Sequence, residues 1–268
     1  MTAAPPAVSV ERVSFAYDRR QPPALEGVDL ELPDAAVTAV LGPNGSGKTT
    51  LLNLILGWLQ PTGGRIRVHG REHRQRGRRE WSRHVGLVSQ DDAAAFELDL
   101  GEYVLLGRAP YLGLLERPGP QDSAAVESAL RTTGLEALRN RPVRSLSGGE
   151  RQLASFARAL AQGPRLLLLD EPLSHLDLAN TRRVLNLLAA LRRQGRAVVL
   201  TTHDPNAAAA VADRAVLLRE GRLVADGPAA EVLTRENLAA TYGVDVEVLG
   251  VGGRTVVLPV LEPREDTS

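Results

Sequence analysis

Eight consecutive residues have the types and spacing of a phosphate-binding loop. They are Gly42, Pro43, Asn44, Gly45, Ser46, Gly47, Lys48 and Thr49, and they fit the pattern G-x-x-x-x-G-K-[ST]. In such a loop backbone N–H groups surround an anion, the lysine reaches the β- and γ-phosphates, and the threonine hydroxyl can hold Mg²⁺. A glycine-rich turn without a ligand is the alternative. We favour phosphate binding because an apolar run over residues 36–41 precedes the loop and a helical stripe over residues 49–59 follows it.

Two adjacent carboxylates, Asp170 and Glu171, follow a second apolar run over residues 166–169. A buried parallel strand would deliver them to its carboxyl end, which is where ligands bind in open parallel sheets. We expect Asp170 to hold Mg²⁺, directly or through water, and Glu171 to orient or deprotonate an attacking water. A solvated acidic turn is the alternative.

A third motif consists of Leu146, Ser147, Gly148, Gly149 and Glu150. Ser147 and Glu150 have the S-x-x-E spacing of a capping box, so the motif predicts the start of a helix. The two glycines between them would also expose backbone N–H groups at that helix N-terminus, which indicates a second anion site.

The elements around these motifs alternate between strand and helix patterns. The segment 165–170, which contains the run before Asp170, and the segments 197–202 and 215–218 predict buried strands. Helices are predicted over residues 179–194 and after Asp204, an expected N-cap. Continuous apolar strands alternating with helices are typical of an α/β fold whose parallel sheet is covered on both faces. The half-polar segments 8–13 and 28–32 predict a separate antiparallel layer.

Two regions depart from this alternation. Residues 91–162 read mostly as helix, and we interpret them as an α-helical insertion in the α/β core. Near the end, Val244, Val246 and Val248 alternate before Gly252-Gly253, so a terminal hairpin is predicted within residues 241–261. Residues 262–268 are expected to form a flexible tail.

The composition excludes several classes of protein. The 268 residues carry 32 Lys or Arg and 32 Asp or Glu, and Lys48 is the only lysine. A net charge of zero argues against bulk electrostatic binding of a polyanion, and the lack of cysteine excludes disulfides and thiolate metal sites. The chain starts without a signal-like segment, and its longest apolar stretches fall far short of the roughly 20 residues that span a bilayer. We therefore expect a cytoplasmic location and no membrane role except through another chain.

Eight arginines stand close together in the sequence, at positions 65, 67, 71, 74, 76, 78, 79 and 83. We interpret this stretch as a solvated loop and strand edge, because Trp81 is the only aromatic residue within it. A nucleic-acid stripe and a lipid-facing patch are the alternatives.

Taken together, the motifs resemble those of the ATPase subunit of an ATP-binding-cassette (ABC) transporter. Residues 42–49 resemble its Walker A loop, residues 146–150 its signature and residues 166–171 its Walker B strand. The other matches, in family order along the chain, are Gln90 for the Q-loop, Ser174, His175, Leu176 and Asp177 for the D-loop, and Thr202, His203 and Asp204 for the H-loop. Tyr17 resembles the aromatic residue that stacks on adenine. Glu150 stands where many members carry glutamine, a familiar variant.

This resemblance implies a P-loop NTPase fold: a RecA-like core with a mainly parallel sheet, an antiparallel β subdomain and an inserted α-helical subdomain. The ABC ATPase domain would cover residues 8–240, with the core and β subdomain over about 8–90 and 163–240 and the helical subdomain over about 91–162. ATP would contact Tyr17 and residues 42–50, including Thr50. Thr49, Gln90 and Asp170 would hold Mg²⁺, and Lys48, Gln90, Glu171 and His203 would act in catalysis.

The resemblance also implies a homodimer or paired cassette, in which the signature of one subunit closes on the ATP of the other. Membrane permease subunits would be direct partners, a solute-binding protein an indirect one, and nucleic acid no direct partner. The protein would thus lie on the cytoplasmic face of the plasma membrane. The segment from Val104 through Gly107 and Arg108 to Pro110, and the pair Tyr242-Gly243, resemble ATPases of iron-siderophore, haem and cobalamin importers. The alternatives are another importer, for metal, molybdate or phosphonate, an exporter, or a soluble ABC ATPase acting on nucleic acid or ribosomes.

Overall fold

A six-stranded sheet forms the centre of the computed structural model, which describes residues 5–18, 20–75, 77–89, 97–113, 115–174 and 176–260. Across the sheet the strands follow the order β5 (Val85–Val88), β6 (Leu166–Leu169), β7 (Ala197–Thr202), β3 (Val37–Leu41), β8 (Arg214–Arg219) and β9 (Arg222–Pro228). Neighbouring strands are parallel except β9, which runs antiparallel to β8. The predicted α/β fold with a mainly parallel sheet is confirmed.

The side chains of the central strands alternate between two hydrophobic cores. Leu167 and Leu169 point into one core and Leu166 and Leu168 into the other, and all four are fully buried. A strand that is buried on both faces therefore reads in the sequence as a continuous apolar run.

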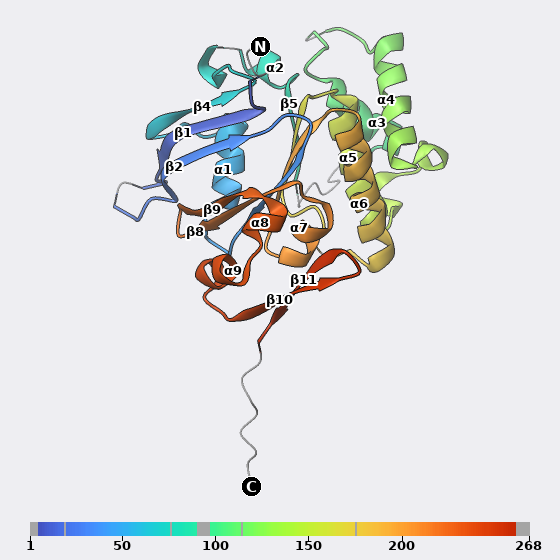
Figure 1. Ribbon diagram of the computed structural model, residues 1–268. Helices are drawn as coiled ribbons and strands as arrows, with labels where there is room; N and C mark the ends of the chain where they lie inside the picture. The colour runs from blue at the N-terminus through green and yellow to red at the C-terminus, as the bar shows by residue number, and fades with distance from the viewer. Residues whose placement is uncertain are drawn as a thin grey trace.

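One of these cores lies between the central sheet and a small antiparallel sheet. The small sheet has the order β2 (Leu25–Leu32), β1 (Val8–Phe15) and β4 (Gly63–Val68). Helix α1 (Lys48–Ile55) contributes Leu51, Leu52 and Ile55 to this core and lies behind β1 and β2 in Figure 1.

The other core lies under a group of helices. They are α3 (Leu100–Leu105), α4 (Pro120–Thr133), α5 (Gly148–Ala161), α6 (Leu178–Arg193) and α7 (Pro205–Val211). The first three pack on one another and lie at one side of the molecule in Figure 1. The short α2 (Arg78–Trp81) precedes β5.

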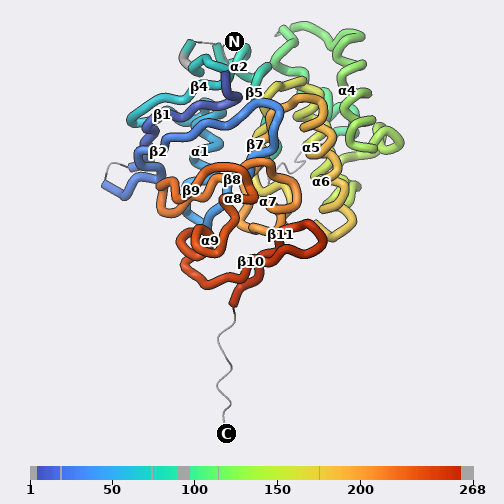
Figure 2. The backbone as a smooth tube through the Cα atoms, viewed as in Figure 1, coloured from blue at the N-terminus to red at the C-terminus, as the bar shows by residue number. Residues whose placement is uncertain are grey.

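The last described part of the chain packs beside the central sheet. It consists of α8 (Ala229–Val232), α9 (Arg235–Tyr242), β10 (Val246–Val251) and β11 (Arg254–Pro259). The last two strands pair as an antiparallel hairpin that lies against α7 and α9 (Figure 2). Among the described residues, no helix combines the length and the apolar character needed to cross a membrane.

Several element boundaries differ from those expected. The first helix spans Lys48–Ile55 rather than residues 49–59, because Gly57 takes a left-handed conformation with φ of 74° and a Cβ there would lie 2.3 Å from the His73 ring. Helix α5 begins at Gly148, directly after Ser147, as the capping-box spacing predicts. Strands β5 and β9 and helices α2, α8 and α9 were not predicted, since they are short and their apolar periodicity is weak.

Candidate functional site

The predicted phosphate loop turns tightly between β3 and α1. Gly47 is the N-cap of α1 and has φ of 103°, a conformation that favours glycine. A Cβ at this position would lie 2.6 Å from the Ala24 carbonyl oxygen. The backbone geometry therefore requires the glycine that precedes the lysine of the motif.

Lys48 folds its side chain back over this loop. Its Nζ donates to the carbonyl oxygens of Gly42 at 2.8 Å and Pro43 at 3.0 Å, and the residue is only 7% exposed. Burial lowers the pKa of Lys48, while the nearby Glu171 and Asp170 carboxylates act in the opposite direction. The ammonium group thus lies where the carboxyl ends of the strands meet.

Thr49 and Asp170 lie together as predicted, although 121 residues separate them in the sequence. The Thr49 hydroxyl lies 3.3 Å from each carboxylate oxygen of Asp170. Within the described residues no group of three His, Cys, Asp or Glu side chains forms a ready metal site. Two adjacent hard oxygen donors nevertheless fit Mg²⁺, which commonly takes one or two protein ligands together with substrate phosphates.

Thr201, in β7, is a site residue that the sequence analysis missed. Its hydroxyl donates to Asp170 Oδ1 at 2.6 Å and accepts the Glu171 N–H at 3.0 Å, and the residue is fully buried. One hydroxyl therefore holds both of the predicted carboxylate residues. The available signal was a polar residue inside an apolar run, immediately before the Thr202-His203-Asp204 motif.

Glu171 and His203 also lie in contact, as their proposed roles require. Glu171 Oε2 lies 3.0 Å from His203 Nδ1 and accepts a hydrogen bond from Ser174 Oγ at 3.1 Å. The Glu171 backbone has φ of 50°, which is uncommon outside glycine and found most often where surrounding contacts determine the conformation. The Glu171 side chain is 15% exposed, whereas that of His203 is 61% exposed.

Two hollows open beside these groups. One of about 350 Å³ is lined by residues 44–50 together with Tyr17, Asp170 and Glu171. The other, of about 490 Å³, is lined by His203 and Ser174 and shares Asn44 and Glu171 with the first. Tyr17 is 65% exposed and its hydroxyl lies 3.2 Å from Thr50 Oγ1. The structure therefore brings the predicted adenine contact, phosphate loop and carboxylates to one place.

The Leu146 to Glu150 motif lies apart from this place. Ser147 caps α5: its Oγ accepts the Glu150 N–H, and Glu150 Oε2 accepts the Ser147 N–H at 2.7 Å. The predicted capping box is confirmed, and these hydrogen bonds lower the pKa of Glu150. No residue of the motif lines either hollow among the described parts of the chain.

The remaining predicted residues have mixed outcomes. Asp177 caps α6 by accepting the Asn180 N–H at 2.7 Å, and Leu176 packs against the core. Gln90 and His175 lie outside the described residues.

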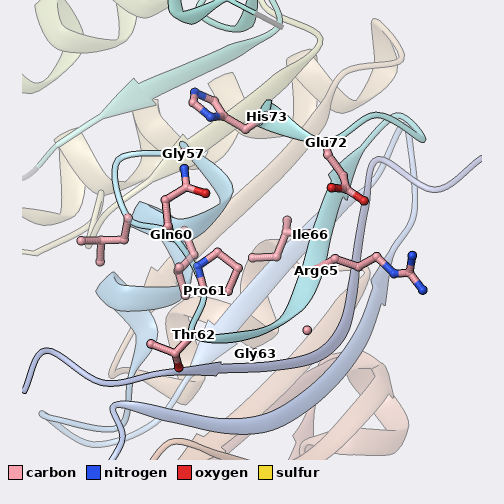
Figure 3. A pocket seen from close by; sticks show the side chains of 12 residues that line it. Gly57, Gln60, Pro61, Thr62, Gly63, Arg65, Ile66, Glu72 and His73 are labelled. Atoms are coloured by element: carbon pink, nitrogen blue, oxygen red, sulfur yellow. The ribbon is translucent and has the colours of Figure 1, made fainter. Parts of the chain in front are cut away.

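A further hollow lies away from the site, between the end of α1 and β4 (Figure 3). It measures about 310 Å³, and Gln60, Ile66, Glu72 and His73 are among its lining residues. None of the predicted site residues lines it. Glu72 is instead paired with Arg67 at 3.7 Å.

Comparisons with known proteins agree with the geometry of the site. The family model for ABC transporters matches residues 25–174. Over 242 residues the chain is 40% identical to the cobalt import ATP-binding protein CbiO of Rhodobacter capsulatus, covering 89% of this chain and 85% of the relative. Over 226 residues it is 41% identical to the hemin import ATP-binding protein HmuV of Streptomyces coelicolor, covering 84% and 80%.

A solved structure gives the same result. The chain is similar to an ABC transporter described as of metal-chelate type, in an inward-facing conformation, with a TM-score of 0.83 and 34% identity, covering 96% of this chain and 98% of the other. The segment that the family model matches, residues 25–174, includes the phosphate loop, the Ser147 motif and both carboxylates. The chain therefore belongs to the ABC transporter family, as one of its ATP-binding cassettes with a P-loop NTPase fold.

Proposed function

We propose that this chain hydrolyses ATP at the phosphate loop and thereby drives import of a metal chelate through a membrane permease. The observation that carries the proposal is the continuous set of contacts from Thr49 through Asp170 and Thr201 to Glu171 and His203. These contacts align a candidate metal-binding pair with a candidate base, beside a loop built for phosphate. ABC cassettes are ATPases coupled to transport.

The loop residues have the roles of binding and orienting ATP. Lys48 exchanges its two loop carbonyls for the β- and γ-phosphates, and the N-terminus of α1 adds its positive dipole. Thr49 and Asp170 would hold Mg²⁺, which would supply positive charge against the charge that develops on the phosphates. Tyr17 lies where it can stack on the base.

Glu171 orients the attacking water and accepts its proton. Its carboxylate is held from two sides, by the hydroxyl of Ser174 and the imidazole of His203. A positioned general base contributes roughly 10²- to 10⁴-fold to a rate. The exposed His203 has room to reach the γ-phosphate while it keeps contact with Glu171.

A second cassette completes the site. Ser147 and Gly149 do not reach the phosphate loop of their own chain, and Ser147 begins a 14-residue helix whose N-terminus favours an anion. A head-to-tail pair would place this motif of one subunit on the γ-phosphate held by the other. Two copies that close on two ATP molecules would then move the permease.

The solute class rests on similarity and on one segment of the chain. The curated relatives include hemin and ferric enterobactin import ATP-binding proteins, together with cobalt and manganese ones. Within the Val104 to Pro110 segment, Arg108 donates hydrogen bonds to the Asp122 carboxylate and the Ala161 carbonyl, and its Cζ lies 3.8 Å from the centroid of the Tyr111 ring. These contacts hold the segment that resembles the importer group in one conformation. Import of a free metal ion is the second candidate. In this proposal the chain binds a membrane permease at the cytoplasmic face of the membrane. A solute-binding protein is an indirect partner.

Glu171→Gln tests the enzymatic part. We expect ATP binding to be retained and turnover to fall by about 100-fold or more, because an amide cannot accept the water proton. Glu220→Gln is a matched control, since Glu220 also has φ of 50° but an 83% exposed side chain. Near-normal phosphate release by the Glu171 variant would contradict its role.

Affinity purification of the full chain from its native membranes tests the transport part. We expect a polytopic membrane protein to co-purify with it. Recovery of ribosomes or nucleic acid instead would favour the soluble class of ABC ATPase.

A further inference from the structure

The last residue of α9 reaches the back of the proposed catalytic site. Helix α9 is fixed in place because Leu238 and Thr241 are fully buried and because Arg219 Nη1, from β8, donates to the Ala240 carbonyl at 2.6 Å. It ends where Gly243 takes a left-handed conformation, with φ of 72°. This leaves Tyr242 held at the edge of the sheet where the phosphate loop and the His203 loop emerge.

The Tyr242 hydroxyl bonds to one of those loops and lies near the other. It donates to the His203 carbonyl oxygen at 3.1 Å, and the Gly42 backbone N–H lies near enough to lower the pKa of the phenol. Burial has the larger effect and raises the pKa of the phenol well above its ordinary value, so the hydroxyl keeps its proton at physiological pH. Only the protonated phenol can donate to the His203 carbonyl.

A second contact of the C-terminal segment holds the same loop three residues further on. The Asn206 side chain donates to the Val257 carbonyl at 3.0 Å and accepts the Val257 N–H at 2.8 Å. Val257 belongs to the terminal hairpin, so the amide acts like one more rung of a β-ladder between α7 and β11. The stretch from His203 to Asn206 is thus anchored at both ends by residues 235–260.

We propose that Tyr242 is a positioning residue for ATP hydrolysis, whose hydroxyl fixes the His203 backbone beside the phosphate loop. This inference rests on the proposed function, in which His203 acts beside Glu171. The His203 side chain is 61% exposed, so few packing contacts hold its ring. The backbone anchor therefore sets how the imidazole meets Glu171 Oε2, 3.0 Å away.

Tyr242→Phe removes this anchor and changes almost nothing else. We expect kcat for ATP to fall about 3- to 10-fold, the effect of one net hydrogen bond, with KM for ATP within about twofold of the parent value. Tyr111→Phe is a matched control, because its hydroxyl also donates to a backbone carbonyl, that of Gln162, at 2.9 Å. The two variants should have similar melting temperatures, and only the first should lose turnover.

The same substitution in a His203→Ala background distinguishes positioning from a general structural role. Residual rates are measured under single-turnover conditions with the full chain. If Tyr242 acts through His203, Tyr242→Phe should cost less than about 1.5-fold in this background. A loss of the same size in both backgrounds, or a raised KM with unchanged kcat, would overturn the inference. Full turnover by His203→Ala alone would instead contradict the proposed role of His203 and leave the proposal for Tyr242 without its basis.

Discussion

Thr201→Val tests whether one buried hydroxyl supports the carboxylate pair. Valine has nearly the same shape as threonine and suits a central β-strand, so the substitution removes two hydrogen bonds without opening a cavity. The lost bonds are the one to Asp170 Oδ1 at 2.6 Å and the one from the Glu171 N–H at 3.0 Å. Both groups stay largely enclosed after the change.

The expected magnitude follows from those two bonds. A hydrogen bond to a charged group contributes about 1.5–3 kcal/mol, and a buried N–H left without a partner costs about 1–3 kcal/mol. We therefore expect the free energy of unfolding to fall by about 3 kcal/mol. Because Asp170 and Glu171 lose a shared support, ATP turnover should fall by about tenfold or more, in line with about 1.4 kcal/mol or more of lost transition-state stabilisation.

Thr38→Val is the matched control in the adjacent strand. Thr38 is 1% exposed, and its hydroxyl has no hydrogen-bond partner among the described residues. Replacing that hydroxyl with a methyl group should stabilise the fold by about 1 kcal/mol, because it removes a buried polar group without a partner. Urea unfolding without nucleotide, followed by tryptophan fluorescence, measures both variants. If Thr201→Val proved as stable as Thr38→Val, the support assigned to Thr201 would be refuted.

Three further substitutions test separate parts of the structure. Lys48→Arg preserves charge but should lose most ATPase activity, because a planar guanidinium cannot replace a compact ammonium in the loop; full phosphate release would contradict this. Asp122→Asn should lower the free energy of unfolding by about 2 kcal/mol at pH 7. The Arg108 guanidinium lowers the pKa of Asp122, so the stabilisation is complete above about pH 4 and is lost as the pH falls through the lowered pKa; a difference that persisted in denaturant titrations at pH 2 would contradict the assignment. Ser147→Ala should cost about 1 kcal/mol through the lost cap and slow hydrolysis, while nucleotide binding to the monomer is unchanged; loss of that binding in calorimetry would place Ser147 in its own chain's site.

The sequence predicted those parts of the site that depend on local geometry. A glycine before Lys48 is required by the turn itself, and Asp170 follows a strand whose continuous apolar run identifies it as buried. Parallel strands bring such ends to one edge, so the meeting of Thr49 with Asp170 could be expected from separate segments. Their contact needed no knowledge of side-chain packing.

Thr201 and Tyr242 could not be predicted in the same way. Threonine is common in strands for its shape alone, and a tyrosine at a helix end is ordinary, so neither residue type indicates a role. Their importance depends on what lies across from them: Asp170 in the neighbouring strand for the first, and the His203 carbonyl, 39 residues earlier in the chain, for the second. Such partners are set by strand order and helix placement, which the sequence pattern left open.

The contrast between one lysine and 31 arginines has a physical basis in the structure. Within the described residues arginine makes the ion pairs that need a fork, as where Arg214 Nε and Nη2 reach both oxygens of Asp226 at 2.8 and 2.6 Å. Lys48 instead places one compact group between two loop carbonyls in a 7% exposed position. An arginine guanidinium at position 48 is wider, so it would have to displace the loop or leave some of its N–H donors without partners. Arginine therefore suits positions where both oxygens of a carboxylate are reached, whereas the geometry of the phosphate loop requires the compact ammonium group at residue 48.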